Sequence, residues 1–471
     1  MKVSGVSAKF GTSGLRGLAE DLIGDTTRRH VTGFARHLLS NGKLDFGGTF
    51  FVGHDFRASS PDIVHDVIAS LGAQGLVVKL AGAVPTPALA LAAMAEGAAA
   101  IMVTGSHIPG DRNGIKFYRP DGEIDKSDEK AIARLASLIV PQSGAPAIAA
   151  ADVFTKTSND FLKRYAKLLP KAALLGMRIG VYQHSTVARD LLVTLLGHFG
   201  AEVTALGRSA HFIPVDTEAV SDETRQLLKG WAASGKFDAF VSADGDGDRP
   251  LVADEAGEVL RGDLVGFLGA HLLKAKLIVT PATSNSSIES LTKDEVIRTR
   301  VGSPFVIAAM DEAVAQRKTG IVGFEANGGF LTGSDFGTLK ALPTRDCFLP
   351  ILAVLATART LNLPISGLPA KFPMAAALSD RIENFPTESS KALMAKLSQS
   401  QENLAEFLSP LGQLKSLNAT DGLRAALDDG SIIHLRPSGN APEFRCYVEA
   451  ATHEKAARLM EQGLRLIKSQ I

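Results

Sequence analysis

Short apolar runs separated by amphipathic stretches follow one plan three times in residues 49–329. The runs lie at 49–57, 75–82 and 98–107, then at 177–185, 201–207 and 237–248, and finally at 276–284, 294–302 and 319–329. They lack clean alternation of apolar and polar residues, which is typical of strands in a parallel sheet that helices cover on both faces. Each repeat therefore predicts strand, helix, strand, helix, strand, followed by a polar, glycine-rich loop.

The pattern changes after Lys371. A long amphipathic helix is expected first, then short strands within 431–439 and 443–450, and a closing helix within 452–470. This order predicts a small α+β domain of about 100 residues. The expected fold is three similar α/β domains with parallel or mixed sheets, followed by that smaller domain, all around a central cleft. The expected boundaries are 1–150, 151–262, 263–370 and 371–471.

The composition of the chain argues against several classes of protein but does not alter the predicted fold. Hydrophobic residues make up 45% of the chain and charged residues 21%, as in ordinary globular proteins. The 50 basic residues equal the 50 acidic ones, whereas nucleic-acid binders usually carry a basic excess. Two cysteines cannot form a disulfide framework. Because no apolar leader is evident and the apolar stretch 83–103 is interrupted by prolines, we expect a cytoplasmic protein with no membrane or nucleic-acid partner, either a monomer or a homodimer.

The sequence DGDGDRP is the most specific local signal. It places carboxylates at alternate positions, at Asp244, Asp246 and Asp248. Such carboxylates repel one another, a hard divalent cation would satisfy them, and the intervening glycines would let the backbone bring them together. A calcium loop of the EF-hand type and a merely solvated acidic turn are the alternatives. Arg249, directly after the loop, suits either a substrate phosphate or a structural ion pair.

Two loops could handle phosphate and protons. In TGSHIPGDRNGIKFY, Ser106 could act as a nucleophile or carry a phosphate, and His107 or Lys116 could move protons. In KFGTSGLRG, Arg16 is a candidate anion site. Read alone, each of these loops could equally be a surface turn.

Two further loops could recognise a substrate. In GFEANGGF, Glu325 and Asn327 suit the vicinal hydroxyls of a sugar. In RPSGNAPEFR, an arginine fork, a hydroxyl, an amide and backbone N–H groups would form a phosphate cradle from Arg436, Ser438, Gly439 and Asn440. An ordinary turn is again the alternative for each.

Together, the loops resemble those of the α-D-phosphohexomutase family over nearly the whole chain. The order FGTSGLRG, TGSHIPGDRNGIKFY, DGDGDRP, GFEANGGF and RPSGNAPEFR matches the family's order. The resemblance implies a phosphoserine at Ser106 that also ligates Mg²⁺ with the three aspartates, charge compensation by Arg16, and His107 or Lys116 as the general acid or base. It further implies a hexose 1,6-bisphosphate intermediate and these substrate-binding residues: Arg249, Ser303, Glu325, Asn327, Arg436, Ser438, Gly439 and Asn440.

The family's sugar loop usually reads Gly-Glu-x-Ser-Gly, whereas Asn327 stands here in place of the serine. The phosphate loop has Asn-Ala-Pro where Thr-Glu-Pro is frequent, and Ile108 replaces a common asparagine. The overall pattern is most similar to bacterial phosphomannomutases, so the expected substrates are mannose 6-phosphate and mannose 1-phosphate. Glucose phosphates are the alternative, glucosamine phosphate is less favoured, and a phosphatase or a non-catalytic sugar-phosphate sensor is a more distant hypothesis.

Overall fold

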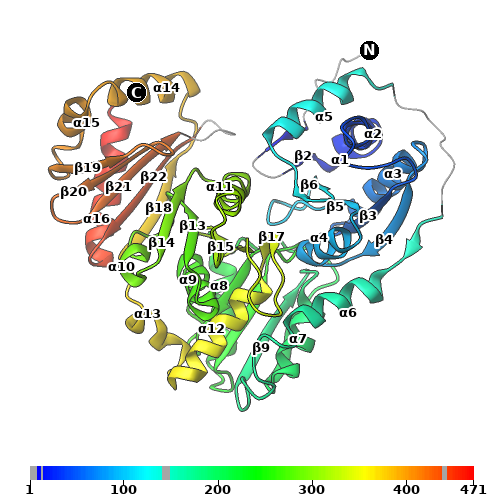
Figure 1. Ribbon diagram of the computed structural model, residues 1–471. Coiled ribbons are helices and arrows are strands. Elements are labelled where there is room, and N and C mark those ends of the chain that lie inside the picture. Colours follow the sequence, from blue (N-terminus) through cyan, green and yellow to red (C-terminus); the bar gives the residue numbers. More distant parts are fainter. Residues whose placement is uncertain (1–7, 12–13, 141–148, 438–442, 471) are drawn as a thin grey trace. The chain divides into compact units, whose positions relative to one another are not determined.

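The computed structural model describes residues 8–11, 14–140, 149–437 and 443–470 (Figure 1). The chain forms two compact units, which consist of residues 1–277 with 302–368, and of residues 278–301 with 369–471. Within the described residues, no single helix is long and apolar enough to cross a membrane.

The first sheet has the three predicted parallel strands at its centre. Its strand order is β1-β2-β6-β5-β3-β4-β8, with β7 paired to β6. β2, β6 and β7 run antiparallel to their neighbours, so the sheet is mixed. The strands are β1 (Lys9–Phe10), β2 (Leu15–Leu18), β3 (Thr49–His54), β4 (Val77–Gly82), β5 (Ala99–Val103), β6 (Arg112–Arg119), β7 (Gly122–Glu123) and β8 (Ala151–Asp152).

Helices cover both faces of this sheet. The side chains of Phe50 and Val52 belong to a core shared with α2 and α3. The intervening Gly53 faces the other way, where a Cβ atom would meet Leu89 of α4 and Met102 of β5, as strand geometry requires. The helices of this region are α1 (Ala19–Leu22), α2 (Asp25–Ser40), α3 (Ser60–Gly72), α4 (Thr86–Ala95), α5 (Lys126–Leu138) and α6 (Phe154–Tyr165).

The second sheet has the order β10-β9-β11-β12. The three predicted strands are parallel, and β12 adds an antiparallel edge that begins just after the DGDGDR sequence. The elements are β9 (Arg178–His184), α7 (Arg189–His198), β10 (Glu202–Arg208), α8 (Asp222–Ala232), β11 (Ala239–Ala243) and β12 (Pro250–Ala253).

The third segment follows the predicted element order and then adds two strands. β15, β16 and β17 form antiparallel neighbours in the first unit. The almost wholly buried helix α12 packs there against α9. The elements are α9 (Gly262–Leu273), β13 (Leu277–Pro281), α10 (Ile288–Leu291), β14 (Glu295–Thr299), α11 (Ser303–Ala315), β15 (Ile321–Phe324), β16 (Phe330–Thr332), β17 (Leu342–Asp346) and α12 (Phe348–Leu361).

The C-terminal part has an antiparallel sheet of order β18-β22-β21-β20-β19 with helices beside it, which confirms the α+β prediction. The single long helix expected there is wrong: the chain breaks at Ser400, whose side chain accepts a hydrogen bond from the Asn403 amide and caps a second helix. The elements are η1 (Ile365–Gly367), α13 (Leu368–Lys371), β18 (Ala376–Ile382), α14 (Thr387–Ser398), α15 (Gln401–Leu408), β19 (Leu414–Asn418), β20 (Leu423–Leu427), β21 (Ile432–Pro437), β22 (Phe444–Ala450) and α16 (His453–Lys468).

Candidate active site

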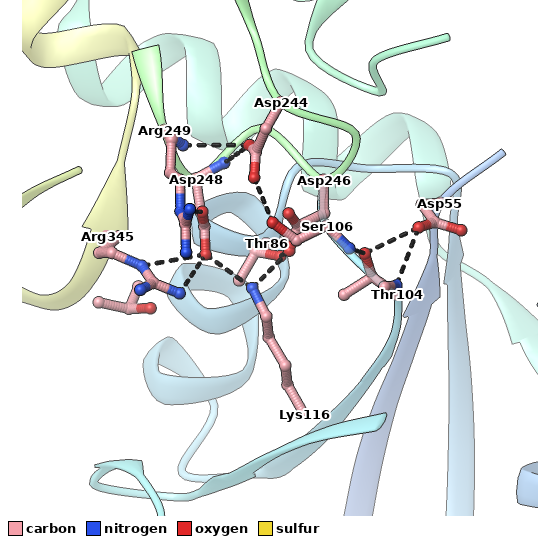
Figure 2. A network of polar contacts seen from close by, with 12 residues as sticks. Asp55, Thr86, Thr104, Ser106, Lys116, Asp244, Asp246, Asp248, Arg249 and Arg345 are labelled. Atoms are coloured by element: carbon pink, nitrogen blue, oxygen red, sulfur yellow. Dashed lines mark hydrogen bonds and ion pairs between the residues drawn. The ribbon is translucent and has the colours of Figure 1, made fainter. Parts of the chain in front are cut away.

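Three of the predicted loops lie close together in the first unit, and each follows a strand. Figure 2 shows the serine loop beside the aspartate loop. Ser106 follows β5, the aspartate loop follows β11, and Glu325 follows β15. The Oγ atom of Ser106 lies 2.5 Å from Oδ2 of Asp244. Ligands of α/β proteins commonly bind at the carboxyl ends of such strands.

Ser106 has a strained backbone that its neighbours hold in place. Its φ angle is +55°, a left-handed conformation that costs a residue other than glycine about 1–2 kcal/mol. The amide of Ser106 donates to Oγ1 of Thr104, and that hydroxyl donates in turn to Asp55. Strain of this kind is often retained at functional sites.

Arg57 holds the same loop in place through hydrogen bonds to its backbone. Its buried guanidinium donates to the carbonyl oxygens of Ser106, Ile108, Pro109 and Arg112, and also to Asp55. A Cβ atom at Gly105 would lie 2.6 Å from the guanidinium carbon, so glycine is required for this close approach.

Replacing Arg57 with lysine should therefore loosen the serine loop. An ammonium group cannot reach all of these carbonyls, and each one left buried without a donor costs about 1–3 kcal/mol. We expect a lower Tm and a fall in kcat of about tenfold or more, measured by thermal unfolding and steady-state kinetics. Arg189→Lys is the control, because Arg189 also donates to two carbonyl oxygens and covers an aromatic ring. An equal loss of kcat in both variants would contradict a specific role for Arg57.

The three aspartates do not use their oxygens alike: both oxygens of Asp244 accept hydrogen bonds, one of them from Ser106, whereas Asp246 and Asp248 each use one. Oδ1 of Asp244 accepts the amides of Asp248 and Arg249. Oδ2 of Asp246 accepts from Lys116 and Thr86, and Oδ2 of Asp248 accepts from Lys116 and Arg345. Within the described residues, the remaining oxygens of Asp246 and Asp248 are buried without a hydrogen-bond partner.

The Oδ1 atoms of Asp246 and Asp248 suit a divalent cation, although Nε of Arg249 lies 3.7 Å from that of Asp248. One oxygen from each aspartate lies within 4.8 Å of the others. Burial, together with the charges of Asp246 and Asp248, raises the pKa of Asp244 well above its usual range, and a cation would offset that repulsion. The solvated-turn alternative is wrong because all three side chains are buried. The EF-hand alternative is also wrong, because strands β11 and β12 flank the loop.

Cationic side chains surround the carboxylates. Burial, together with the neighbouring guanidinium groups of Arg249 and Arg345, lowers the pKa of Arg16 to about 10. Burial alone would lower the pKa of Lys116, but the carboxylates of Asp246 and Asp248 raise it. The positive charges of Arg16, Arg249 and Arg345 repel one another. An anion such as phosphate, bound among them, would offset this repulsion.

His107 lies beside the serine hydroxyl. Its Nδ1 atom is 3.2 Å from Ser106 Oγ, and its Nε2 atom is 3.9 Å from an oxygen of Asp216. Burial and the nearby Arg249 lower the pKa of His107 to about 3. The imidazole is therefore neutral at pH 7, with one ring nitrogen unprotonated.

Comparison with known proteins identifies the family. The models for phosphoglucomutase/phosphomannomutase match at residues 7–139 (α/β/α domain I), 261–373 (α/β/α domain III) and 384–465 (C-terminal domain). The chain is 51% identical over 470 residues to a phosphomannomutase of Sinorhizobium fredii, an alignment that covers 98% of this chain and 99% of the relative. The chain belongs to the α-D-phosphohexomutase family. It is therefore an enzyme of the isomerase class that transfers phosphoryl groups.

Two other similar proteins agree with this assignment. A phosphomannomutase of Salmonella muenchen is 42% identical, with 98% of this chain and 96% of the relative covered. The crystal structure of a phosphoglucomutase/phosphomannomutase family protein from Burkholderia thailandensis superposes with a TM-score of 0.78 at 21% identity, covering 98% of this chain and 97% of that one. The latter likeness supports the fold.

The sugar-loop residues of this phosphohexomutase differ in how they are held. Glu325 accepts from Arg345 at 2.9 Å, which ties it to the aspartate loop. Asn327 folds back, and its Oδ1 atom accepts the Gly329 amide. Ser303, at the start of α11, donates weakly to Glu123.

Arg436 lies in the second unit, near the end of β21, where its Nε atom is 2.8 Å from an oxygen of Asp421. Ser438, Gly439 and Asn440, the other predicted members of the phosphate loop, lie outside the described residues.

Sequence reasoning missed the residues that support this network, which are Asp55, Arg57, Thr86, Thr104 and Arg345. Arg345 is the most important of the residues that were not predicted, because it is almost fully buried and contacts both Asp248 and Glu325. A signal was available, because the charged pair Arg345-Asp346 is separated from the apolar helix α12 by Cys347 alone. Charges in such surroundings are seldom buried unless paired.

Proposed function

We propose that this phosphohexomutase is a phosphomannomutase, which interconverts mannose 6-phosphate and mannose 1-phosphate through a phosphoserine at Ser106 and a hexose 1,6-bisphosphate. The observation that carries the proposal is the position of Ser106 Oγ, between Asp244 Oδ2 and His107 Nδ1. The choice of mannose is supported by the two phosphomannomutases that align over nearly the full chain.

In the first half of the cycle, a free hydroxyl of the hexose monophosphate attacks phosphoserine. A bond forms between the hydroxyl oxygen and phosphorus, and the bond between phosphorus and Ser106 Oγ breaks. The hydroxyl proton passes to the neutral imidazole of His107, which delivers it to Oγ of Ser106, 3.2 Å from its Nδ1 atom, as that oxygen leaves phosphorus. Lys116, held as an ammonium by two carboxylates, supplies positive charge and a proton donor rather than a base.

In the second half, the bisphosphate turns over and its other phosphoryl group returns to Ser106, which regenerates the phosphoenzyme. Arg16, Arg249 and Arg345 offset charge around the group in transfer, since phosphoryl transfer depends mainly on positioning and electrostatics. Mg²⁺ held by Asp244, Asp246 and Asp248 supplies further charge neutralisation when bound.

Each of the four expected domains would contribute one loop to the site, and the last two loops would recognise the substrate. We assign the phosphoserine loop to residues 1–150, the metal loop to 151–262, the sugar loop to 263–370 and the phosphate loop to 371–471. Glu325, Asn327 and Ser303 would contact the sugar. The phosphate that does not react would be held by Arg436, Ser438, Gly439 and Asn440.

The decisive experiment compares specificity constants for the 1-phosphates of mannose, glucose and glucosamine, with free phosphate measured in parallel. We expect isomerisation, with mannose 1-phosphate preferred or equalled by glucose 1-phosphate, because the two sugars differ only at C2. A clear preference for glucosamine 1-phosphate would overturn the choice of sugar. Net phosphate release without isomerisation would instead indicate a phosphatase.

Arg436→Lys should weaken substrate binding. A lysine loses the planar fork that suits phosphate, at a cost of about 1.5–3 kcal/mol, or roughly ten- to a hundredfold in affinity. The loss should appear in KM more than in kcat and should be similar for 1- and 6-phosphates, because the two ends of the bisphosphate exchange places.

Arg424→Lys is the matched control. Its side chain is 16% exposed, against 17% for Arg436, and it pairs with Glu449. An unchanged KM in Arg436→Lys, or an equal rise in the control, would place the phosphate cradle elsewhere.

A further inference from the structure

Thr86 joins the first sheet to the aspartate loop through two hydrogen bonds. It begins helix α4, which follows β4, and it is completely buried. Its amide donates to the carbonyl oxygen of Asp246 at 2.9 Å, and its hydroxyl donates to Oδ2 of the same residue at 2.6 Å (Figure 2). One threonine therefore fixes both the backbone and the carboxylate of the central aspartate.

The backbone is shaped for this approach. Gly247 adopts a φ of +68°, and a Cβ atom there would lie only 3.1 Å from Cβ of Pro85, the residue before Thr86. Glycine thus allows the aspartate loop to reach the start of α4.

The hydroxyl of Thr86 decides which oxygen of Asp246 is free. Oδ2 is occupied by Thr86 and Lys116, whereas Oδ1 is buried and has no hydrogen-bond partner among the described residues. Loss of the hydroxyl would leave Oδ2 with the ammonium of Lys116 alone, on a flexible side chain. The carboxylate could then rotate away from its observed orientation, in which one of its oxygens lies within 4.8 Å of an oxygen from each of the other two aspartates.

We propose that Thr86 is a positioning residue of the metal site, which orients Asp246 for a divalent cation although it begins a helix that packs against a different sheet. The proposal rests on the proposed function only in taking the aspartates to hold Mg²⁺. Among the side chains that hold these carboxylates, Thr86 carries no charge, unlike Lys116 and Arg345. Its removal therefore tests orientation without altering the electrostatic attraction for the cation.

The test uses two pairs of variants that differ by a hydroxyl: Thr86 against Thr86→Val, and Thr86→Ser against Thr86→Ala. Binding of Mn²⁺ to the unphosphorylated full-length protein is measured by electron paramagnetic resonance and calorimetry. Removal of such a supporting hydrogen bond commonly weakens metal binding by about 10- to 100-fold. We expect that loss within each pair, and near wild-type affinity for Thr86→Ser.

A second readout separates positioning from general destabilisation. The Mg²⁺ concentration for half-maximal activity should rise in Thr86→Val, while kcat at saturating Mg²⁺ should recover to within about threefold of wild type, because high metal concentration offsets weaker binding. Thr27→Val is the control. It removes a buried hydroxyl that donates to the carbonyl of Leu22 in α1, and metal affinity should not change.

Mn²⁺ affinity within twofold of the matched partner in both pairs would overturn the proposal. An equal loss in Thr86→Ser and Thr86→Ala would do the same, because the γ-methyl group would then be responsible. These outcomes leave the proposed function intact if wild type binds Mn²⁺ and Asp246→Ala does not. Equal Mn²⁺ binding by wild type and Asp246→Ala would overturn both the metal assignment and the role of Thr86.

Discussion

Ser106→Ala should lower kcat by about four orders of magnitude or more, because a methyl group cannot form the bond to phosphorus on which the proposed cycle depends. The phosphate found on the wild-type protein by intact mass and peptide mapping should be absent. Incubation with hexose 1,6-bisphosphate should rephosphorylate the wild type but not the variant. Mutase activity near the wild-type level in Ser106→Ala would contradict the phosphoserine mechanism.

Ser106→Gly separates catalysis from folding. Because Ser106 has a φ of +55°, glycine should relieve backbone strain of about 1–2 kcal/mol. This variant should therefore be inactive yet as stable as wild type, or more so, in thermal unfolding. Ser70→Ala removes a buried hydroxyl that donates to the carbonyl of Asp66 in α3, and it should keep full activity.

The parallel strands could be predicted from the sequence, whereas the antiparallel additions could not. Apolar runs such as 49–57 and 98–107 become β3 and β5 because both faces of these strands are covered. β6 lies largely within TGSHIPGDRNGIKFY, which is expected to be a loop, and its sequence RNGIKFYR contains polar residues where a buried strand should be apolar. Asn113 and Lys116 are nevertheless buried there, because their partners come from α3 and from the aspartate loop.

The reacting groups of the candidate site could be predicted, and most of their supports could not. Ser106, His107 and the three aspartates stand in local motifs whose chemistry can be interpreted one loop at a time. Arg57, Thr86 and Arg345 act through partners 20 to 160 positions away. Such pairings depend on how the sheets pack against one another, and spacing along the chain does not record that.

Asp246→Ala should abolish tight binding of Mg²⁺ and Mn²⁺ and lower kcat by about a thousandfold. Two remaining carboxylates cannot replace the third around a cation that prefers near-octahedral oxygen coordination. A loss of several kcal/mol in transition-state charge stabilisation corresponds to a factor of this size. Calorimetry with each metal and steady-state kinetics across a range of Mg²⁺ concentrations would measure both effects.

The fold should tolerate this change, which makes the result interpretable. Asp246 is one of three buried carboxylates that repel one another, and Lys116 keeps Asp248 as a partner when Asp246 is removed. Asp254→Ala is the matched control: Asp254 is also largely buried after β12, but its side chain caps the amides of Ala256 and Glu258. We expect the control to lose stability and keep its metal affinity, and Asp246→Ala to show the reverse. Unchanged Mg²⁺ affinity and turnover in Asp246→Ala would show that the DGDGD loop is not the metal site, since Asp246 supplies one of the three clustered oxygens assigned to the cation.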